Sequence, residues 1–407
     1  MSNKDEIPPC QQLRKVLTYK NINMKEHLIP FYNPTEKIIV KSTDCYLTDS
    51  ENNEYIDFES GVWCANVGHN HPRLTQVIEA QSKENMHHGY RFRNHFSEEL
   101  AEELNRKIGF DGGQSVFLSS GSEAVNLAIT ISRHLTQKEK ILKINNSFLS
   151  AYGYGQLSPA NLNKTDVEFN NTDSISDINF DAISAFVLES GGASIDVVRF
   201  PEKEFVLKLV RAAKEHGALV IVDEVTTGFG RTGEWFGFMH YGIEPDIVVT
   251  AKGLGNGFPI SAVTINSTVA SRLKGNPLIY LQSHINDPLG CAIGLEVIRI
   301  IDDEKLIERS RKTGIYFKGK LNLIMEKHSG KIVDVRARGM ILAIEFSTHI
   351  DGSSINNQLF NKGLLVGFKA NTLRFLPPLT LKLSDIDKFI VALDEILKET
   401  TNNQQPC

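Results

Sequence analysis

The chain has 407 residues, with 44 Lys and Arg against 49 Asp and Glu, so its formal net charge is −5. This length allows two packed domains with a cleft between them, and the acidic balance argues against a dedicated nucleic-acid-binding protein. The longest apolar runs are only about as long as a strand, as at Ala218–Val222, so we expect no membrane-spanning helix. The polar residues 1–9 lack the apolar core of a signal peptide, and five scattered cysteines favour a cytoplasmic, reducing environment.

The first sixty residues are expected to form an N-terminal arm or to join a smaller domain. Two short strands are predicted in this region, at Tyr46–Thr48 and Glu54–Phe58. Because the residue pattern changes again near residue 288, we divide the rest of the chain into a large domain, residues 61–288, and a C-terminal small domain, residues 289–407.

The middle of the chain alternates helical and strand patterns. Glu202–His216 has apolar residues at four-residue spacing, and Gly217 is a natural helix stop. The apolar runs at Ala218–Val222, Ala182–Leu188 and Asp246–Thr250 are typical of buried parallel strands. Alternation of this kind predicts an open α/β sheet, in which ligands bind beyond the carboxyl ends of the strands.

After residue 288 the pattern becomes that of an α+β domain. Asp287 and Pro288 are a good N-cap and first-turn pair for a long helix. Later strands are predicted at Lys331–Val335, Met340–Phe346, Gly363–Phe368 and Thr372–Phe375. We expect the last helix to begin at Ser384, with Asp387 completing an approximate capping box.

Two strand ends carry the strongest chemical signal. One apolar strand runs into Asp223, and a second runs into Lys252, 29 residues later (252 − 223). A carboxylate at a strand end is usually a cap, and a lysine before a glycine is usually on the surface. If the two strands are near neighbours, however, the carboxylate and the amine project into one crevice at the binding edge of the sheet.

A third signal is the turn from a strand into a helix at Ser120-Gly121-Ser122-Glu123. Gly121 permits close backbone approach, and the free amides of a helix N-terminus suit a phosphate group. The same residues also fit an ordinary capping box between Ser120 and Glu123, without any ligand. Both interpretations stay open on local grounds.

Other candidate sites are weaker. The spacing Gly-x-Gly-x-x-Gly at Gly228–Gly233 does not directly turn a strand into a helix, which disfavours nicotinamide binding. His69, His71 and the pair His87-His88 fall in expected loops without a matched carboxylate or thiol set, so no metal site is expected.

Taken together, these segments resemble the class III aminotransferases, which use pyridoxal phosphate (PLP) on the fold-type-I scaffold. The resemblance runs from about residue 46 to 397. Its specific core is formed by Val222–Gly233, Asp246 and Ala251–Gly253, and it is supported by Gly61, Gly68–Pro72, Ser119–Val125 and Leu373–Pro378. The resemblance implies a large α/β domain with a mainly parallel seven-stranded sheet, a smaller α+β domain, and a homodimer with sites at its interface.

The resemblance also implies roles for individual residues at the cofactor. Lys252 looks like the lysine that forms a Schiff base with PLP, and Asp223 looks like the partner of the pyridine nitrogen. The other positions similar to cofactor-binding residues are Ser120, Gly121 and Ser122 at the phosphate, Phe148 on the ring, Thr226 near the phenolic oxygen, and Ser283 reaching the phosphate of the other subunit.

On the substrate side, Arg374 is similar to the arginine that grips a substrate carboxylate, although a surface arginine at a strand edge is also possible. Glu189 aligns with a glutamate near the cofactor that in some members pairs with that arginine. Trp63 and Tyr32 resemble residues near the substrate entrance, and either is also compatible with a place in the core.

The implied activity is transfer of an amino group from an amino acid or ω-amine to a 2-oxo acid, pyruvate or 2-oxoglutarate. A PLP-dependent racemase, epimerase or aminomutase on the same scaffold is the alternative, and a non-catalytic protein with this fold is a third. Departures from the usual pattern at Leu149-Ser150, Ser190, Thr226 and 283–288 leave the donor undetermined, so the sequence does not assign the chain to the acetylornithine, ornithine or 4-aminobutyrate enzymes.

Overall fold

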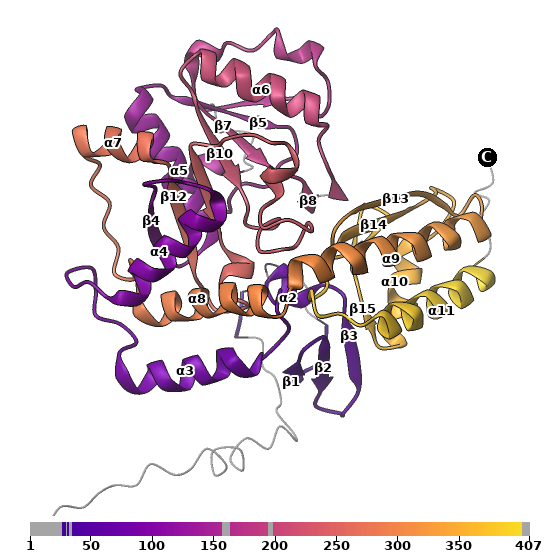
Figure 1. The fold of residues 1–407 in the computed structure, drawn as a ribbon. Helices are drawn as coiled ribbons and strands as arrows, with labels where there is room; N and C mark the ends of the chain where they lie inside the picture. The colour runs from indigo at the N-terminus through magenta and orange to yellow at the C-terminus, as the bar shows by residue number, and fades with distance from the viewer. Residues whose placement is uncertain (1–26, 30, 32–34, 157–162, 194–197, 401–407) are drawn as a thin grey trace, which may run out of the picture.

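The computed structural model describes residues 27–29, 31, 35–156, 163–193 and 198–400. Figure 1 shows a large region built on one wide sheet and, beside it, a smaller region with its own sheets. No helix within these ranges combines the length and apolar character needed to cross a bilayer. The domain boundaries at residues 60 and 288 stay a prediction.

The large region contains a seven-stranded sheet. Its strands, in spatial order, are β4 (Gln114–Leu118), β12 (Ser261–Ile265), β11 (Ile247–Thr250), β10 (Leu219–Asp223), β7 (Ile183–Glu189), β5 (Lys140–Ile144) and β6 (Lys164–Val167). Only β12 runs antiparallel to its two neighbours. The expected mainly parallel sheet is therefore confirmed, and β10 is buried along its whole length, as its continuous apolar run indicates.

Helices cover both faces of this sheet. The large region contains α3 (Pro72–Glu84), α4 (His95–Ile108), α5 (Gly121–Thr136), α6 (Lys203–Glu215), α7 (Ser267–Gly275) and α8 (Pro288–Asp303). Leu219 and Ile221 of β10 pack with α5, whereas Val220 and Val222 pack with α4, α6 and α8. This alternation along one strand places α5 and α7 on one face and α4, α6 and α8 on the other.

The smaller region has two four-stranded sheets. One has the order β13 (Ile332–Arg338), β14 (Ile341–Phe346), β17 (Thr372–Phe375) and β16 (Gly367–Lys369), with helices α9 (Leu306–Lys327), α10 (Gly352–Asn361) and α11 (Leu383–Glu399). The other has the order β1 (Ile39–Thr43), β2 (Tyr46–Asp49), β3 (Glu54–Asp57) and β15 (Leu364–Leu365). Because β15 pairs with β3, residues 39–57 join the smaller region, one of the two outcomes expected for them.

Two predicted details are wrong. The predicted strand Gly363–Phe368 is divided between β15 and β16, which belong to different sheets. The last helix begins at Leu383 rather than Ser384, and Lys382 at its N-cap makes no side-chain cap. Asp387 does not complete a capping box, because its carboxylate accepts a hydrogen bond from the Tyr316 hydroxyl at 2.6 Å.

The loop after β10 is anchored by two buried charged residues. The carboxylate of Glu224 accepts hydrogen bonds from the hydroxyls of Ser190 and Thr227, each at 2.6 Å, and from two backbone amides farther along the loop. Arg231 donates to the side chain of Asn66 at 2.6 Å and to the carbonyl of Pro377. The Gly228–Gly233 spacing therefore belongs to a loop packed between the two regions, not to a strand-to-helix turn that binds a dinucleotide.

Replacing Arg231 by methionine tests this anchor. Arg231 is fully buried, so the variant leaves the Asn66 oxygen and the Pro377 carbonyl without their donor. We expect the free energy of unfolding to fall by roughly 2–5 kcal/mol, measured by urea denaturation. The matched control is Arg211→Met on the exposed face of α6, which we expect to stay near the wild-type value. Equal stability of Arg231→Met and the control would contradict this role.

Candidate functional site

The carboxyl ends of three neighbouring strands meet at one cavity. Asp223 and Glu189 are the last residues of β10 and β7 and lie side by side in the register, and Lys252 follows β11 by two residues. All three line a cavity of about 290 Å³. The sequence-based expectation that Asp223 and Lys252 share a crevice is met by the structure, because β10 and β11 are hydrogen-bonded neighbours.

Lys252 is held in a strained and desolvated position. Its φ is +40°, a left-handed conformation that costs a residue with a side chain about 1–3 kcal/mol. Its amine donates to the Thr226 hydroxyl at 3.2 Å and lies 4.4 Å from the centre of the Trp63 ring. Burial lowers the pKa of Lys252 below its ordinary value of 10.5, so a larger share of this lysine is neutral than on the surface.

The two carboxylates beside Lys252 respond to burial in the opposite direction. Burial raises the pKa of Asp223 to about 7, although the Val225 amide donates to it at 3.0 Å. Burial, and then the neighbouring Asp223 charge, raise the pKa of Glu189 to about 8. A cation bound beside Asp223 would favour its charged form and lower that pKa. The two carboxylates would therefore favour a positively charged group in this cavity.

The start of α5 forms another wall of the cavity. Ser120, Gly121 and Ser122 all line it. One half of the expected capping box is present, because the Ser120 hydroxyl accepts the Glu123 amide at 3.2 Å, while the Glu123 carboxylate accepts the amide of Ser119 at 3.0 Å instead of that of Ser120. A Cβ on Gly121 would lie 3.1 Å from the Val225 methyl groups, so only glycine fits here without a shift. The first amides of a helix lack partners within it, so the cap and an anion site are compatible here.

Aromatic side chains complete the cavity. Phe148 and Trp63 both line it, and the backbone amide of Phe148 donates to Glu189. Trp63 ends a short turn, α2 (Ser60–Trp63), in which all four residues have positive φ. Asp57 holds this turn, because its carboxylate accepts the amide of Gly61 at 2.8 Å. Such local strain is typical of functional sites in which surrounding contacts fix the conformation.

Arg374 lies behind Trp63 and outside the set of residues that line the cavity. Its side chain is only 14% exposed, and β17 has neighbours on both sides, so it is not a surface arginine at a strand edge. Its guanidinium lies 5.3 Å from the centre of the Trp63 ring. Glu59 lies 3.9 Å from Arg374, whereas Glu189, which aligns with a glutamate that pairs with the arginine in some members, lies near Asp223 and Lys252.

Glu59 is a site residue that the sequence did not reveal. Burial raises its pKa to about 7, and it accepts a hydrogen bond from the Trp63 indole at 3.3 Å. A Cβ on Gly367, which faces Arg374 in the register, would lie 2.1 Å from Glu59. Because this contact joins segments about 300 residues apart, no local sequence pattern could have indicated it.

Two predicted site residues stand apart from the cavity. Ser283 is exposed in the segment before α8 and is not among the described residues that line the cavity. Tyr32 lies outside the described residues. Cys64, which was not predicted, does line it.

The chemistry of the cavity fits PLP. A buried amine with a lowered pKa suits covalent attachment, a buried carboxylate suits a protonated ring nitrogen, and a helix start suits a phosphate group. Lys252, Asp223 and the Ser120–Ser122 turn would hold the group, and Phe148 offers an apolar face for its ring.

Comparison with known proteins agrees with this geometry. The family model described as "Aminotransferase class-III" matches residues 31–150 and 151–397. The acetylornithine aminotransferase of Caldanaerobacter subterraneus subsp. tengcongensis is 32% identical over 407 residues, covering 94% of this chain and 99% of that protein.

Solved structures give the same result. The acetylornithine aminotransferase from Elizabethkingia anophelis superposes with a TM-score of 0.81 at 25% identity, covering 92% of this chain and 96% of that one. The ornithine aminotransferase from Toxoplasma gondii, whose crystal had partial PLP occupancy at the active site, has the same fold, with a TM-score of 0.85 at 23% identity over 96% and 98% of the two chains. Because the family model spans nearly the whole described chain, this protein belongs to the class III aminotransferases and is a PLP-dependent transaminase of fold type I.

Proposed function

We propose that Lys252 is the catalytic amine of this transaminase and that Asp223 holds the charge on the cofactor's ring nitrogen. The observation that carries this proposal is the single cavity in which the lysine amine and the two strand-end carboxylates meet. PLP, when bound, supplies an electron sink that stabilises negative charge at the donor carbon. Ser120, Gly121 and Ser122 would hold its phosphate, and Phe148 would pack on its ring.

We assign to the Lys252 amine the removal of the proton from the donor carbon. Because its pKa is lowered, the Lys252 amine would be neutral more often than a surface lysine and could accept a proton from the donor carbon. Thr226 accepts a hydrogen bond from this amine and thereby orients it. Asp223 supplies a buried negative charge, and its contribution depends on the exclusion of water from the cavity.

Arg374 is the proposed anchor for a substrate carboxylate, because its planar guanidinium can make two parallel hydrogen bonds. The Nε atom of Arg374 is buried and has no hydrogen-bond partner among the described residues, so its N–H is unsatisfied. Trp63 lies beside both Arg374 and Lys252, so we assign it to the wall of the substrate path. Relatives named acetylornithine aminotransferase make N-acetylornithine the first donor to test.

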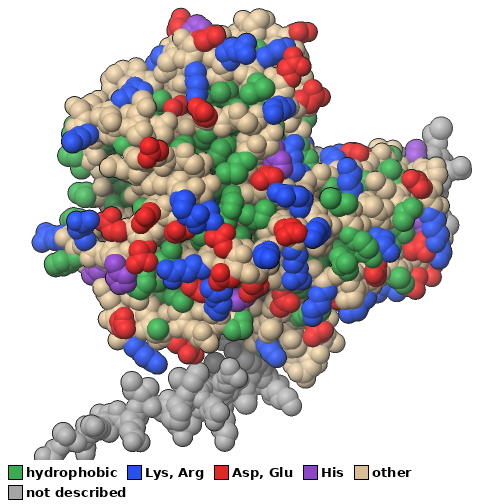
Figure 2. All heavy atoms as spheres, in the orientation of Figure 1, with side chains coloured by type: hydrophobic (Ala, Val, Ile, Leu, Met, Phe, Trp, Pro, Cys, Tyr) green, Lys and Arg blue, Asp and Glu red, His purple; other side chains and the backbone are tan. Residues whose placement is uncertain are grey.

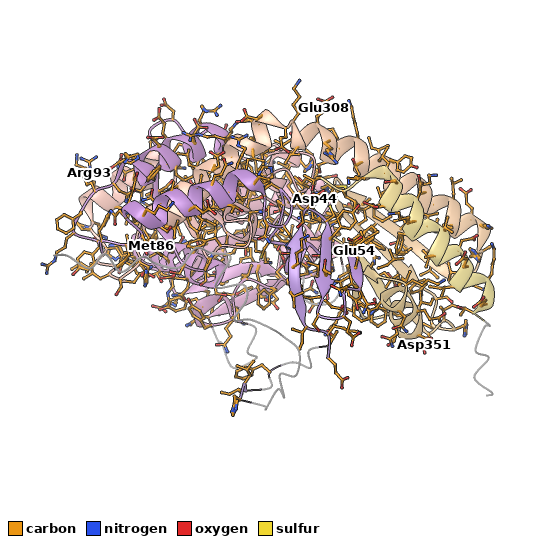
Figure 3. The ribbon with its side chains drawn as sticks, turned by 90° about the horizontal axis from the view of Figure 1, so that it is seen from below. Asp44, Glu54, Met86, Arg93, Glu308 and Asp351 are labelled. Atoms are coloured by element: carbon orange, nitrogen blue, oxygen red, sulfur yellow. The ribbon has the colours of Figure 1, made fainter. Side chains whose placement is uncertain are left out.

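A homodimer is the proposed assembly. Apolar side chains gather on two segments that meet at one end of the large region, where the rings of His87 and His284 are 4.7 Å apart. These exposed residues are Met86, Tyr90, Phe92, Ile279 and Leu281. Figure 3 shows Met86 at the end of the molecule opposite Asp351, and Figure 2 shows hydrophobic side chains along the left edge, where the α7–α8 loop runs in Figure 1. An exposed apolar patch of this kind marks an interface.

The free cysteines Cys45, Cys64 and Cys291 support a cytoplasmic location, which also belongs to the proposal. The racemase, epimerase or aminomutase alternative is not favoured, because the family and its named relatives are aminotransferases.

The half-reaction tests the proposed function. With N-acetylornithine alone, we expect about one keto product per chain, after which the reaction stops until pyruvate or 2-oxoglutarate is added. Ornithine and 4-aminobutyrate serve as comparison donors in the same assay, read by mass spectrometry. Isomerised donor without any keto product would refute the transfer reaction and favour the alternative.

Replacing Lys252 by alanine tests the catalytic amine. We expect turnover to fall by roughly 10²–10⁴-fold or more, with loss of the bound cofactor's visible absorbance and of borohydride labelling of the chain. Lys208→Ala, at a half-exposed position on α6, is the matched control and should behave as wild type. Wild-type turnover in the Lys252 variant would overturn the assignment.

The Glu59–Arg374 pair predicts a pH-dependent KM. Below pH 7 Glu59 is largely protonated and neutral, since its pKa is raised to about 7, so Arg374 is free for the substrate carboxylate. As the pH rises above 7, Glu59 ionises and competes, and KM should rise by up to about tenfold per pH unit.

Glu59→Gln should remove this rise, whereas Glu345→Gln, which breaks a more exposed glutamate–arginine pair in the same sheet, should keep it. Because Asp223 and Glu189 also titrate near neutral pH, the decisive quantity is the difference between the Glu59 variant and this control. Identical KM–pH profiles in the two variants would contradict the proposed competition.

A further inference from the structure

A carboxylate at the start of α8 lies between two histidines from different parts of the chain. Oδ1 of Asp287 is 2.6 Å from Nδ1 of His87, and Oδ2 is 2.5 Å from Nδ1 of His284. One ligand atom from each of the three residues lies within 4.8 Å of the others. We propose that His87, His284 and Asp287 form a binding site for a divalent transition-metal ion of the zinc class.

The side chain of Asp287 does not cap the helix that it precedes. Asp287 occupies the N-cap position of α8, yet its side chain makes no cap hydrogen bond. Asn94 and Ser120, at the same position of α4 and α5, do accept a backbone amide. Both oxygens of Asp287 face the imidazoles instead.

The backbone around the three residues is fixed. The side-chain oxygen of Gln282 accepts the amide of His284, which orients that residue. Asn286 has a positive φ of 57°, and its side-chain oxygen accepts the amide of Phe117 in β4 at 2.9 Å. The side chain of Asn94 donates to the carbonyl of Asn286 at 2.8 Å. His284 and Asp287 are thus presented from a segment tied to the sheet and to α4.

The donor set selects the class of metal. Imidazole nitrogen together with carboxylate oxygen suits Zn²⁺, Co²⁺ and Ni²⁺, whereas Mg²⁺ and Ca²⁺ prefer oxygen ligands. With metal bonds of about 2.0 Å, the nitrogen–oxygen separations would widen to about 3.3 Å in a tetrahedral site. In the single chain the side chains of His87 and His284 are 44% and 60% exposed, which leaves room for that adjustment.

The surroundings leave room for a fourth ligand. The three residues line a cavity of about 350 Å³ together with Met86, Phe117 and Leu289, among others. This cavity shares Ser119 and Phe258–Ile260 with the Lys252 cavity, but none of its three proposed ligands lines that other cavity. All three ligands come from one chain within the apolar patch assigned to the dimer, so we expect one ion per chain.

An anion is the competing occupant, because a helix N-terminus favours negative charge. Here Asp287 already supplies that negative charge, and both imidazoles already face its oxygens. A second anion would have to displace the carboxylate, whereas a cation would gain all three groups as ligands. The observations therefore favour a metal ion.

Zinc binding to the full-length, PLP-loaded enzyme tests the proposal, after removal of excess PLP, which itself binds metals. Isothermal titration with Zn²⁺ and elemental analysis after dialysis should give one tightly bound ion per chain. In His284→Ala and Asp287→Asn the affinity should fall at least about tenfold, the loss that even an outer partner of a metal ligand causes. Co²⁺ should show the visible absorption of a low-symmetry site in the wild type and lose it in both variants.

The matched control is His216→Ala, which removes an exposed histidine paired with Asp181 and should keep wild-type zinc affinity. His284 is largely exposed, so its variant tests the site even if Asp287→Asn folds poorly. Absence of tight zinc binding in the wild type, or equal affinity in His284→Ala, would overturn the proposal. Binding of inorganic phosphate that depends on His284, without zinc binding, would overturn it in favour of an anion site.

Discussion

Desolvation of the Lys252 amine beside Asp223 and Glu189 is the constraint on which the rest of the structure depends. The same loss of water lowers the pKa of the lysine and raises those of the two acids. Each group therefore moves toward its neutral form, and a positively charged group bound beside the two acids would favour their ionised forms again. Burial of three ionisable groups is unfavourable for folding, so the surrounding structure has to hold them in place.

Two sets of hydrogen bonds provide that support. Glu224, directly after Asp223, uses its four hydrogen bonds to fix the loop that follows β10. The left-handed turn at Ser60–Trp63 is fixed by Asp57 and by a hydrogen bond from the Ser60 hydroxyl to the Leu376 carbonyl at 2.6 Å. The Ser60–Leu376 bond ties this turn to the segment after β17, and Arg231, in the loop that follows β10, donates to the Pro377 carbonyl, so the site and the packing of the two regions are parts of one network.

The centre of this site was predictable, and its periphery was not. Asp223 and Lys252 could be brought together from sequence because consecutive parallel strands end at one edge of a sheet. The approach of Glu59 to Arg374 depends on packing between distant segments, and alignment pointed to Glu189 instead. The contact between His87 and Asp287 also depends on packing between distant segments, because the two residues are 200 positions apart. Neither residue's local sequence pattern pointed to the other. Local capping rules also failed at Ser384, because the carboxylate of Asp387 accepts a hydrogen bond from Tyr316 and forms an ion pair with Lys320.

The pairing of β3 with β15 has a consequence for how the protein is made. Ile56 and Leu364 are register partners, 308 residues apart (364 − 56). At ordinary rates of synthesis, the ribosome needs roughly 15–60 s to cover that stretch. During that time β3 has no strand on its outer side, and the nascent chain carries an open sheet edge that invites aggregation. The smaller region can close only after β15 has been made, when every strand of the large sheet has already been synthesised.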